Sequence, residues 1–237
     1  MRTDGRAADE MRKVKATLGF SKFAEGSCLI EIGDTMVLCN ASVEERVPPH
    51  VTSGGWVTAE YSMLPRANRE RSKRDISKLK LSGRSAEIQR LIGRSLRSAI
   101  DLEALGQRTV TIDCDVLQGD GGTRTASVTG GFIALALACR RLMEQGKITQ
   151  MPLKTYVSGI SAGIVRNEAM LDLCYEEDSR ALVDLNCVMT AEGDLIELQA
   201  TGEGRPFTIE DQRKLIALCR KGNAVLTQMQ RRCLGAL

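Results

Sequence analysis

The sequence RTVTIDCDVLQGDGGTR, from Arg108 to Arg124, carries in turn the signals of a strand, a glycine-rich loop and the start of a helix. Apolar and polar residues alternate as far as Gln118, which is typical of a strand with one buried face. The glycines then interrupt this pattern, and from Ala126 to Glu144 apolar residues recur at helical spacing. We therefore predict a strand, a tight loop and a long helix.

The flanking segments add further helices and strands. Cys28–Glu45 is rich in β-branched and apolar residues around Gly33-Asp34, which predicts a hairpin, and Gly83–Ile100 has a helical apolar stripe. Ser158–Thr201 predicts successive antiparallel strands, and Thr208 with Asp211 forms the capping pattern of a last long helix. Helices alternate with hairpins, so we expect an α+β fold with mixed sheets packed against helices.

The composition is that of a globular protein. Apolar residues make up 43% and charged residues 27% of 237 residues, and no linker divides the chain, so we expect a single domain over residues 1–237. The apolar run Phe132–Cys139 is too short for a bilayer span, and the N-terminus begins with charged residues. We expect a cytoplasmic protein with no membrane partner.

The cysteines and the histidine restrict the chemistry. None of the eight cysteines form a C-x-x-C pair and most lie in apolar segments, which favours reduced core thiols over disulfides. His50 is the only histidine, so a zinc cluster of cysteines and histidines cannot form and a serine triad would depend on that one residue. Carboxylates, arginines and backbone groups remain as the candidate functional groups.

The glycine loop is a candidate anion site. Glycines allow the backbone to approach an anion, a helix N-terminus offers free N–H groups, and Arg124 adds a fork of donors beside Gly122 and Thr123. Arg84, at the start of the preceding helix, could supply a second guanidinium. An ordinary turn explains the glycines equally well on local grounds.

Acidic residues gather further along the chain. If the chain is extended from Asp178 to Asp184, their even spacing places both carboxylates on one face, where they could hold Mg²⁺ or Mn²⁺. The apolar residues Leu182, Val183 and Leu185 indicate a largely buried setting for Asp184. A solvated strand edge is the commoner explanation for such a cluster.

Basic residues are concentrated between Arg66 and Arg97, where they far outnumber acidic ones and include Lys78 and Lys80. A local basic surface of this kind suits a phosphate backbone, although the net charge is only +3. A solvated loop and helix face is the alternative. The arginines at 90, 94 and 97 share one face of the predicted helix.

Four long motifs in this order resemble ribonuclease PH. They are GWVTAEYSMLPRA (Gly55–Ala67), SGRSAEIQRLIGRSLRSAIDL (Ser82–Leu102), IDCDVLQGDGGTRTASVTG (Ile112–Gly130) and LDLCYEEDSRALVDLNCVMT (Leu171–Thr190). The pattern R-x-D-G-R at Arg2–Arg6 and the segment QATGEGRPF near the C-terminus extend the resemblance to nearly the whole chain.

The resemblance implies a fold related to the second domain of ribosomal protein S5 and a homohexamer built as a trimer of dimers. It implies that inorganic phosphate, the co-substrate, is bound by Arg84, Gly122, Thr123 and Arg124. It also implies that Asp178 and Asp184 bind Mg²⁺ or Mn²⁺, with Asp184 as general acid. The catalytic residues would then be Arg84, Arg124, Asp178 and Asp184. The RNA-binding residues would be Arg66, Arg69, Arg71 and Arg74.

The implied reaction is phosphorolysis. A phosphate-dependent 3′ to 5′ exoribonuclease would trim transfer RNA precursors, with ribosomal RNA as a second candidate, release nucleoside 5′-diphosphates and run in reverse as a nucleotidyltransferase. Several residues depart from the usual family pattern, which leaves room for altered RNA affinity or a flexible loop over residues 66–80: Leu79, Gly119, Cys174, Ala200 and Gly202. Two rivals remain, a non-catalytic ring subunit that binds RNA and a metal-dependent hydrolytic nuclease.

Overall fold

The computed structural model describes residues 2–74 and 82–237. The first half of the chain builds a five-stranded sheet in the order β1-β2-β3-β5-β4. Its strands are β1 (Val14–Leu18), β2 (Gly26–Ile32), β3 (Thr35–Glu44), β4 (Trp56–Met63) and β5 (Thr109–Gln118). Only β4 and β5 run parallel, so this sheet is mixed, as the sequence predicts.

The second half builds a four-stranded antiparallel sheet in the order β7-β6-β8-β9. Its strands are β6 (Val157–Val165), β7 (Glu168–Leu171), β8 (Val183–Thr190) and β9 (Leu195–Thr201). Two hairpins, β6-β7 and β8-β9, join through β6 and β8 in the middle of the sheet. The α+β class is therefore confirmed.

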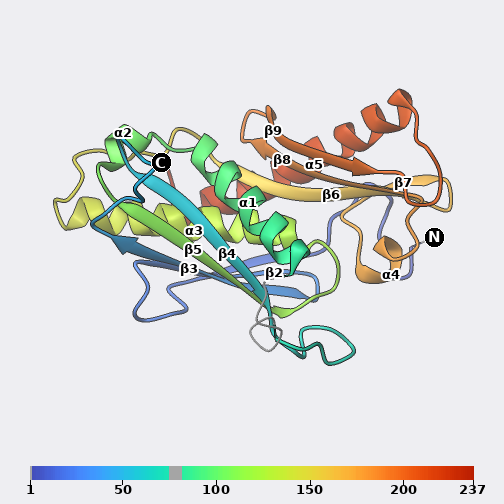
Figure 1. Cartoon of the computed structure of the whole chain (residues 1–237). Helices are drawn as coiled ribbons and strands as arrows, with labels where there is room; N and C mark the ends of the chain where they lie inside the picture. Colours follow the sequence, from blue (N-terminus) through green and yellow to red (C-terminus); the bar gives the residue numbers. More distant parts are fainter. Residues whose placement is uncertain (1, 75–81) are drawn as a thin grey trace.

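The longest helices cover these sheets. They are α1 (Gly83–Ser98), α3 (Thr123–Glu144) and α5 (Ile209–Leu234), with the short α2 (Leu102–Leu105) and α4 (Tyr175–Asp178) in connections. Helix α3 contacts β2 and β3 on one side and β6 on the other, α1 lies along β4, and α5 lies along β6 (Figure 1). The central position of α3 fixes where its N-terminus, and hence the glycine loop, sits between the sheets.

Helix α3 is also long and apolar enough to cross a bilayer by length and composition alone. In this fold 78% of its most apolar window is buried, because both sheets pack against it. The same apolar core contains Ile30 of the first sheet, Phe132 of α3, Ile160 of the second sheet and Leu226 of α5. The apolarity of α3 is thus explained by its place in the core.

Most predicted elements appear where expected. The hairpin turns at Gly33, whose φ of 56° is left-handed, and helix α1 begins at Gly83 after its cap Ser82. Thr208 and Asp211 form the predicted capping box of α5. All eight cysteines are free, as predicted. Helix α3 begins three residues before the predicted start at Ala126, directly after the left-handed Gly122.

The segment between β7 and β8 corrects a prediction. Asp178 is the last residue of helix α4 and not part of an extended strand, so the argument from its even spacing to Asp184 was wrong. Strand β7 ends at Leu171, and the next residue, Asp172, has a left-handed φ of 51°. Glu177 then accepts a hydrogen bond from the Cys174 backbone N–H at 3.1 Å and closes the helical turn. Local capping, which strand spacing ignores, decides this geometry.

Candidate active site

The N-terminus of α3 presents backbone donors to the surface. Gly121 and Gly122 both have left-handed φ values, 77° and 65°, which glycine adopts without steric cost. No side chain caps this helix end, and the hydroxyl of Thr125 donates instead to the Gly122 carbonyl at 2.9 Å. The first-turn N–H groups at Thr123 and Arg124 therefore stay available to an anion at the positive end of the helix dipole.

Tyr61 fixes the first residue of this helix. Its hydroxyl and that of Thr123 lie 2.8 Å apart, and both side chains are buried. Burial raises the pKa of Tyr61, an effect that the positive charges of Arg84 and Arg124 oppose. The phenol therefore stays neutral near pH 7 and can donate a hydrogen bond, which orients the Thr123 hydroxyl.

The Arg124 guanidinium is held from two elements. It donates to Gln199 of β9 at 3.0 Å and to Glu87 of α1 at 3.4 Å, while the Gln199 amide donates to the same Glu87 oxygen at 3.1 Å. The Arg124 side chain is 17% exposed, so one edge still reaches solvent. An incoming phosphate would compete with Glu87 for this guanidinium.

Arg84 lies in the first turn of α1. Its side chain is exposed, and its charge acts on the hydroxyl of Tyr61 and on the carboxyl of Asp178. Arg124 acts on these same two groups. Two guanidiniums predicted from separate parts of the sequence are thus close enough to influence the same two groups.

The two predicted acidic residues also meet there. The pKa of Asp184 is raised to about 6, first by burial and then by the negative charge of Asp178, while Arg124 and a hydrogen bond from Asn186 oppose the rise. The Asn186 amide donates to the Asp184 carboxylate at 2.8 Å. Burial raises the pKa of Asp178 as well, with Arg84 opposing. A helical turn and a strand thus deliver carboxylates that repel each other.

This pair suits a divalent cation. Mg²⁺ and Mn²⁺ prefer carboxylate oxygens and commonly use one or two of them, with water and phosphate oxygens as the other ligands. Within residues 2–74 and 82–237, no basic side chain lies within 4.0 Å of Asp178 or Asp184, and no cluster of three or more acidic, cysteine or histidine ligands occurs. A two-carboxylate site therefore fits only a cation that shares its coordination with substrate and water.

The predicted RNA-binding arginines follow β4 in an exposed loop. The side chains of Arg66, Arg71 and Arg74 are exposed, and Arg69 forms a 3.2 Å ion pair with Glu176 of α4. This contact places the loop beside the turn that carries Asp178. The predicted contributions of Lys78 and Lys80, and the departure at Leu79, lie outside the described residues.

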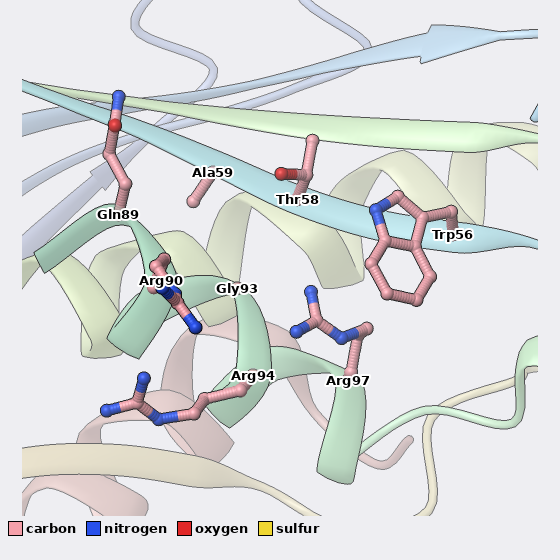
Figure 2. Close-up of a pocket in the computed structure, with 8 residues that line it drawn as sticks. All are labelled: Trp56, Thr58, Ala59, Gln89, Arg90, Gly93, Arg94 and Arg97. Carbon is pink, nitrogen blue, oxygen red and sulfur yellow. The ribbon is translucent and has the colours of Figure 1, made fainter. Parts of the chain in front are cut away.

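A separate basic pocket of about 390 Å³ lies between α1 and β4 (Figure 2). Its lining includes Arg90, Arg94 and Arg97, which share a helix face as the sequence predicts. Arg97 stacks over the Trp56 ring at 4.2 Å and donates to the Val57 carbonyl at 2.7 Å. None of the predicted catalytic residues lines this pocket, so its arginines form a second basic surface.

Sequence patterns alone did not single out several residues of the site. Asn186 follows Asp184 by two residues on β8 and Glu87 follows Arg84 by three on α1, so their spacing was an available signal. Tyr61 and Gln199 gave no such signal, because each reaches the site only through the pairing register of its strand. Buried Arg12, which contacts the glycine loop, was also missed.

Solved structures share this fold. Rice (Oryza sativa) Rrp46 superposes with a TM-score of 0.77 at 20% identity, over 98% of this chain and 100% of that one. A chain of the Archaeoglobus fulgidus exosome, with RNA bound to its active site, gives a TM-score of 0.79 at 23% identity, over 93% and 90%. A chain of an archaeal exosome core gives 0.74 at 22% identity, over 98% and 90%.

Two family models match the sequence itself. The model of the 3′ exoribonuclease family, domain 1, matches residues 10–140, and the model of domain 2 matches residues 155–222. The first match includes both predicted phosphate-binding segments, and the second includes both acidic residues. Since the domain 1 model alone matches more than half of the residues of this chain, the chain belongs to the ribonuclease PH family of 3′ exoribonucleases.

Proposed function

We propose that this protein removes nucleotides from RNA 3′ ends by phosphorolysis and releases nucleoside 5′-diphosphates. Transfer RNA precursors are the proposed main substrates, with ribosomal RNA as a second. The bond broken is a phosphodiester and the bond formed is a phosphoanhydride, so the reaction is reversible and excess nucleoside diphosphate extends the 3′ end. The proposed setting is the cytoplasm, and the proposed assembly is a homohexamer built from three dimers.

One observation carries this proposal. The charges of Arg84 and Arg124 act on the carboxyl group of Asp178, and α4, which ends at Asp178, begins against Gly121 at the uncapped N-terminus of α3. The proposed phosphate site and the proposed acidic site are therefore neighbours and not merely present in one chain. Phosphoryl transfer needs this arrangement, because catalysis rests on positioning the phosphates and on stabilising their charge.

The side chains then have distinct proposed roles. Arg84, Arg124, the Thr123 hydroxyl and the amides of α3 hold inorganic phosphate, whose oxygen attacks the last phosphodiester in line with the departing 3′-oxygen. The raised pKa of Asp184, about 6, leaves a protonated fraction near neutral pH, and this protonated form donates to that oxygen. Asp178 and Asp184 hold Mg²⁺ or Mn²⁺, which supplies charge neutralisation on the transferring group when bound.

The test is product identity. The purified protein is incubated with a 3′-extended transfer RNA and Mg²⁺, with and without inorganic phosphate, and the released nucleotides are separated. Nucleoside diphosphates that appear only with phosphate are the expected result. Monophosphates released without phosphate would instead identify a hydrolytic nuclease, and the proposal would be wrong.

A non-catalytic ring subunit is the second candidate, favoured by the likeness of the fold to a chain of an archaeal exosome core. Such a subunit would bind RNA without releasing any nucleotide under either condition. The adjacent arginines and carboxylates argue against it, because RNA binding alone does not need a pair of acidic residues whose like charges repel each other and the RNA backbone.

A further inference from the structure

Arg12 joins two loops that come from different halves of the chain. Its side chain is 6% exposed and lies just before β1. The guanidinium makes a two-pronged ion pair with Asp172, Nε to Oδ2 at 3.0 Å and Nη2 to Oδ1 at 2.7 Å. The same guanidinium donates from Nη1 to the carbonyl of Asp120, and from Nη2 to that of Gly121 at 3.5 Å.

The two joined loops also touch directly. A Cβ atom at Gly121 would lie 2.4 Å from the carbonyl oxygen of Leu173 and 3.0 Å from the Tyr175 nitrogen, so only glycine fits there. The Asp120 carboxylate accepts a hydrogen bond from the Tyr175 N–H at 3.2 Å. The glycine loop that opens α3 therefore rests against the start of α4, the helix that ends at Asp178.

Each loop has a support of its own besides Arg12. The Thr35 hydroxyl donates to the Gly121 carbonyl at 2.7 Å and accepts from the Asp120 N–H at 2.9 Å. Thr35 therefore supports the glycine loop and not the α4 turn. Arg2 forms a buried two-pronged pair with Glu177, at 2.8 and 2.7 Å, and also donates to the carbonyls of Leu171 and Asp172, so it supports the α4 side of the contact. Within the described part of the chain, Arg12 is the side chain from outside both loops that binds both of them, while the Asp120 carboxylate links them from within the glycine loop.

We propose that Arg12 is a positioning residue that sets the distance between the phosphate-binding end of α3 and the turn that carries Asp178. Arg12 itself contacts neither phosphate nor cation. This inference rests on the proposed function, because it assigns those two ligands to the two loops. Phosphate and cation then bind cooperatively through Arg12, since each loop is placed by the other.

Three variants separate this role from ordinary stabilisation. Arg12→Met keeps most of the aliphatic part of the side chain and removes the bonds of the guanidinium to both loops. Thr35→Val removes a support of the glycine loop only. Arg2→Met removes a support on the α4 side only. For each folded variant, the KM for inorganic phosphate is measured at low and at saturating Mg²⁺, at a temperature well below its Tm. The wild-type protein must first release nucleoside diphosphates, and its failure there would refute the proposed function and not the role of Arg12.

In the wild-type protein, saturating Mg²⁺ is expected to lower the KM for phosphate. Arg12→Met should raise both the KM for phosphate and the Mg²⁺ requirement, each by roughly 10- to 100-fold, as expected for groups that orient ligands, and should remove their mutual dependence. Thr35→Val should change mainly the phosphate KM, and Arg2→Met mainly the Mg²⁺ requirement. A fall in Tm alone, or a change in one ligand only, for Arg12→Met would overturn the proposal.

A conservative variant covers the case in which Arg12→Met does not fold. Arg12→Lys keeps the charge and the pairing with Asp172, but an ammonium group lacks the planar fork that reaches two partners at once. It should therefore fold and still lose the coupling between phosphate and Mg²⁺. Retention of wild-type coupling in Arg12→Lys would show that charge alone suffices, and the bridging role would be refuted.

Discussion

Asp184 lies where its charge is unfavourable for folding. Its pKa of about 6 exceeds the ordinary value of 3.8, so the folded protein binds this proton more tightly than the unfolded chain does. The free energy of unfolding of the metal-free protein therefore decreases as pH rises from about 4 to about 6 on account of this group. A cation bound beside Asp178 and Asp184 would reverse this penalty, because it favours the ionised carboxylates.

Asp184→Asn should abolish turnover, yet retain RNA binding and raise the Tm of the metal-free protein at pH 7.5. The amide removes the acid and a cation ligand, but it also removes a charge that burial disfavours. Single-turnover phosphorolysis, RNA binding and thermal unfolding are measured together. Asp113→Asn is the matched control, because burial raises the pKa of Asp113 too, although it lies on β5. A fully active Asp184→Asn variant would remove this residue from the mechanism.

Arg124→Ala should raise the KM for inorganic phosphate by about 100-fold and leave the fold intact. Loss of one charged fork from a phosphate site costs on the order of 2–3 kcal/mol, since hydrogen bonds to charged groups are the strong ones. Steady-state phosphorolysis at varied phosphate concentration checks this. Arg108→Ala serves as control, because Arg108 is 18% exposed and pairs with Glu45 away from the site. An unchanged phosphate dependence in Arg124→Ala would contradict the assignment.

Among the helices, local sequence signals predicted the three long ones and missed the short helix α4. Helices α1, α3 and α5 carry their own apolar stripes, and two of them carry side-chain caps, so the sequence was sufficient. The turn of α4 was missed because strand spacing ignores the local cap between Cys174 and Glu177, and because the left-handed Asp172 before it is held by Arg12 from the other end of the chain. No pattern within residues 171–190 contains that contact.

The residues of the candidate site also divide into those with a signal in the sequence and those that depend on contacts between distant segments. Arg84, Arg124, Asp178 and Asp184 were candidates from local sequence patterns, and their roles were assigned because long motifs resemble a known family. The hydrogen bond between Tyr61 and Thr123 depends on β4 running parallel beside β5, and strand β4 was not predicted. Residues that support the predicted catalytic groups are therefore the ones that required the structure, since pairing register brings them together.

For RNA binding by the whole molecule, the distribution of charge over the surface matters more than the net charge. The net charge of +3 is too small to make the protein a general ligand for polyanions. The exposed arginines of the loop after β4, at positions 66, 69, 71 and 74, instead concentrate positive charge beside α4. An RNA backbone held by this loop would lead its 3′ end toward the glycine loop and the two carboxylates.

Arg71→Ala should weaken binding of single-stranded RNA and leave the KM for inorganic phosphate unchanged. Each phosphate contact contributes counterion release, so the slope of log affinity against log salt concentration should become less steep by roughly 0.7 for one contact on a single strand. Fluorescence anisotropy across a salt series measures this slope. Arg46→Ala is the matched control, because Arg46 is 82% exposed and pairs with Glu44 in a different part of the surface. Equal slopes for the two variants would mean that the loop does not contact the RNA backbone through Arg71, and the path of the RNA would have to be sought along the arginines of α1.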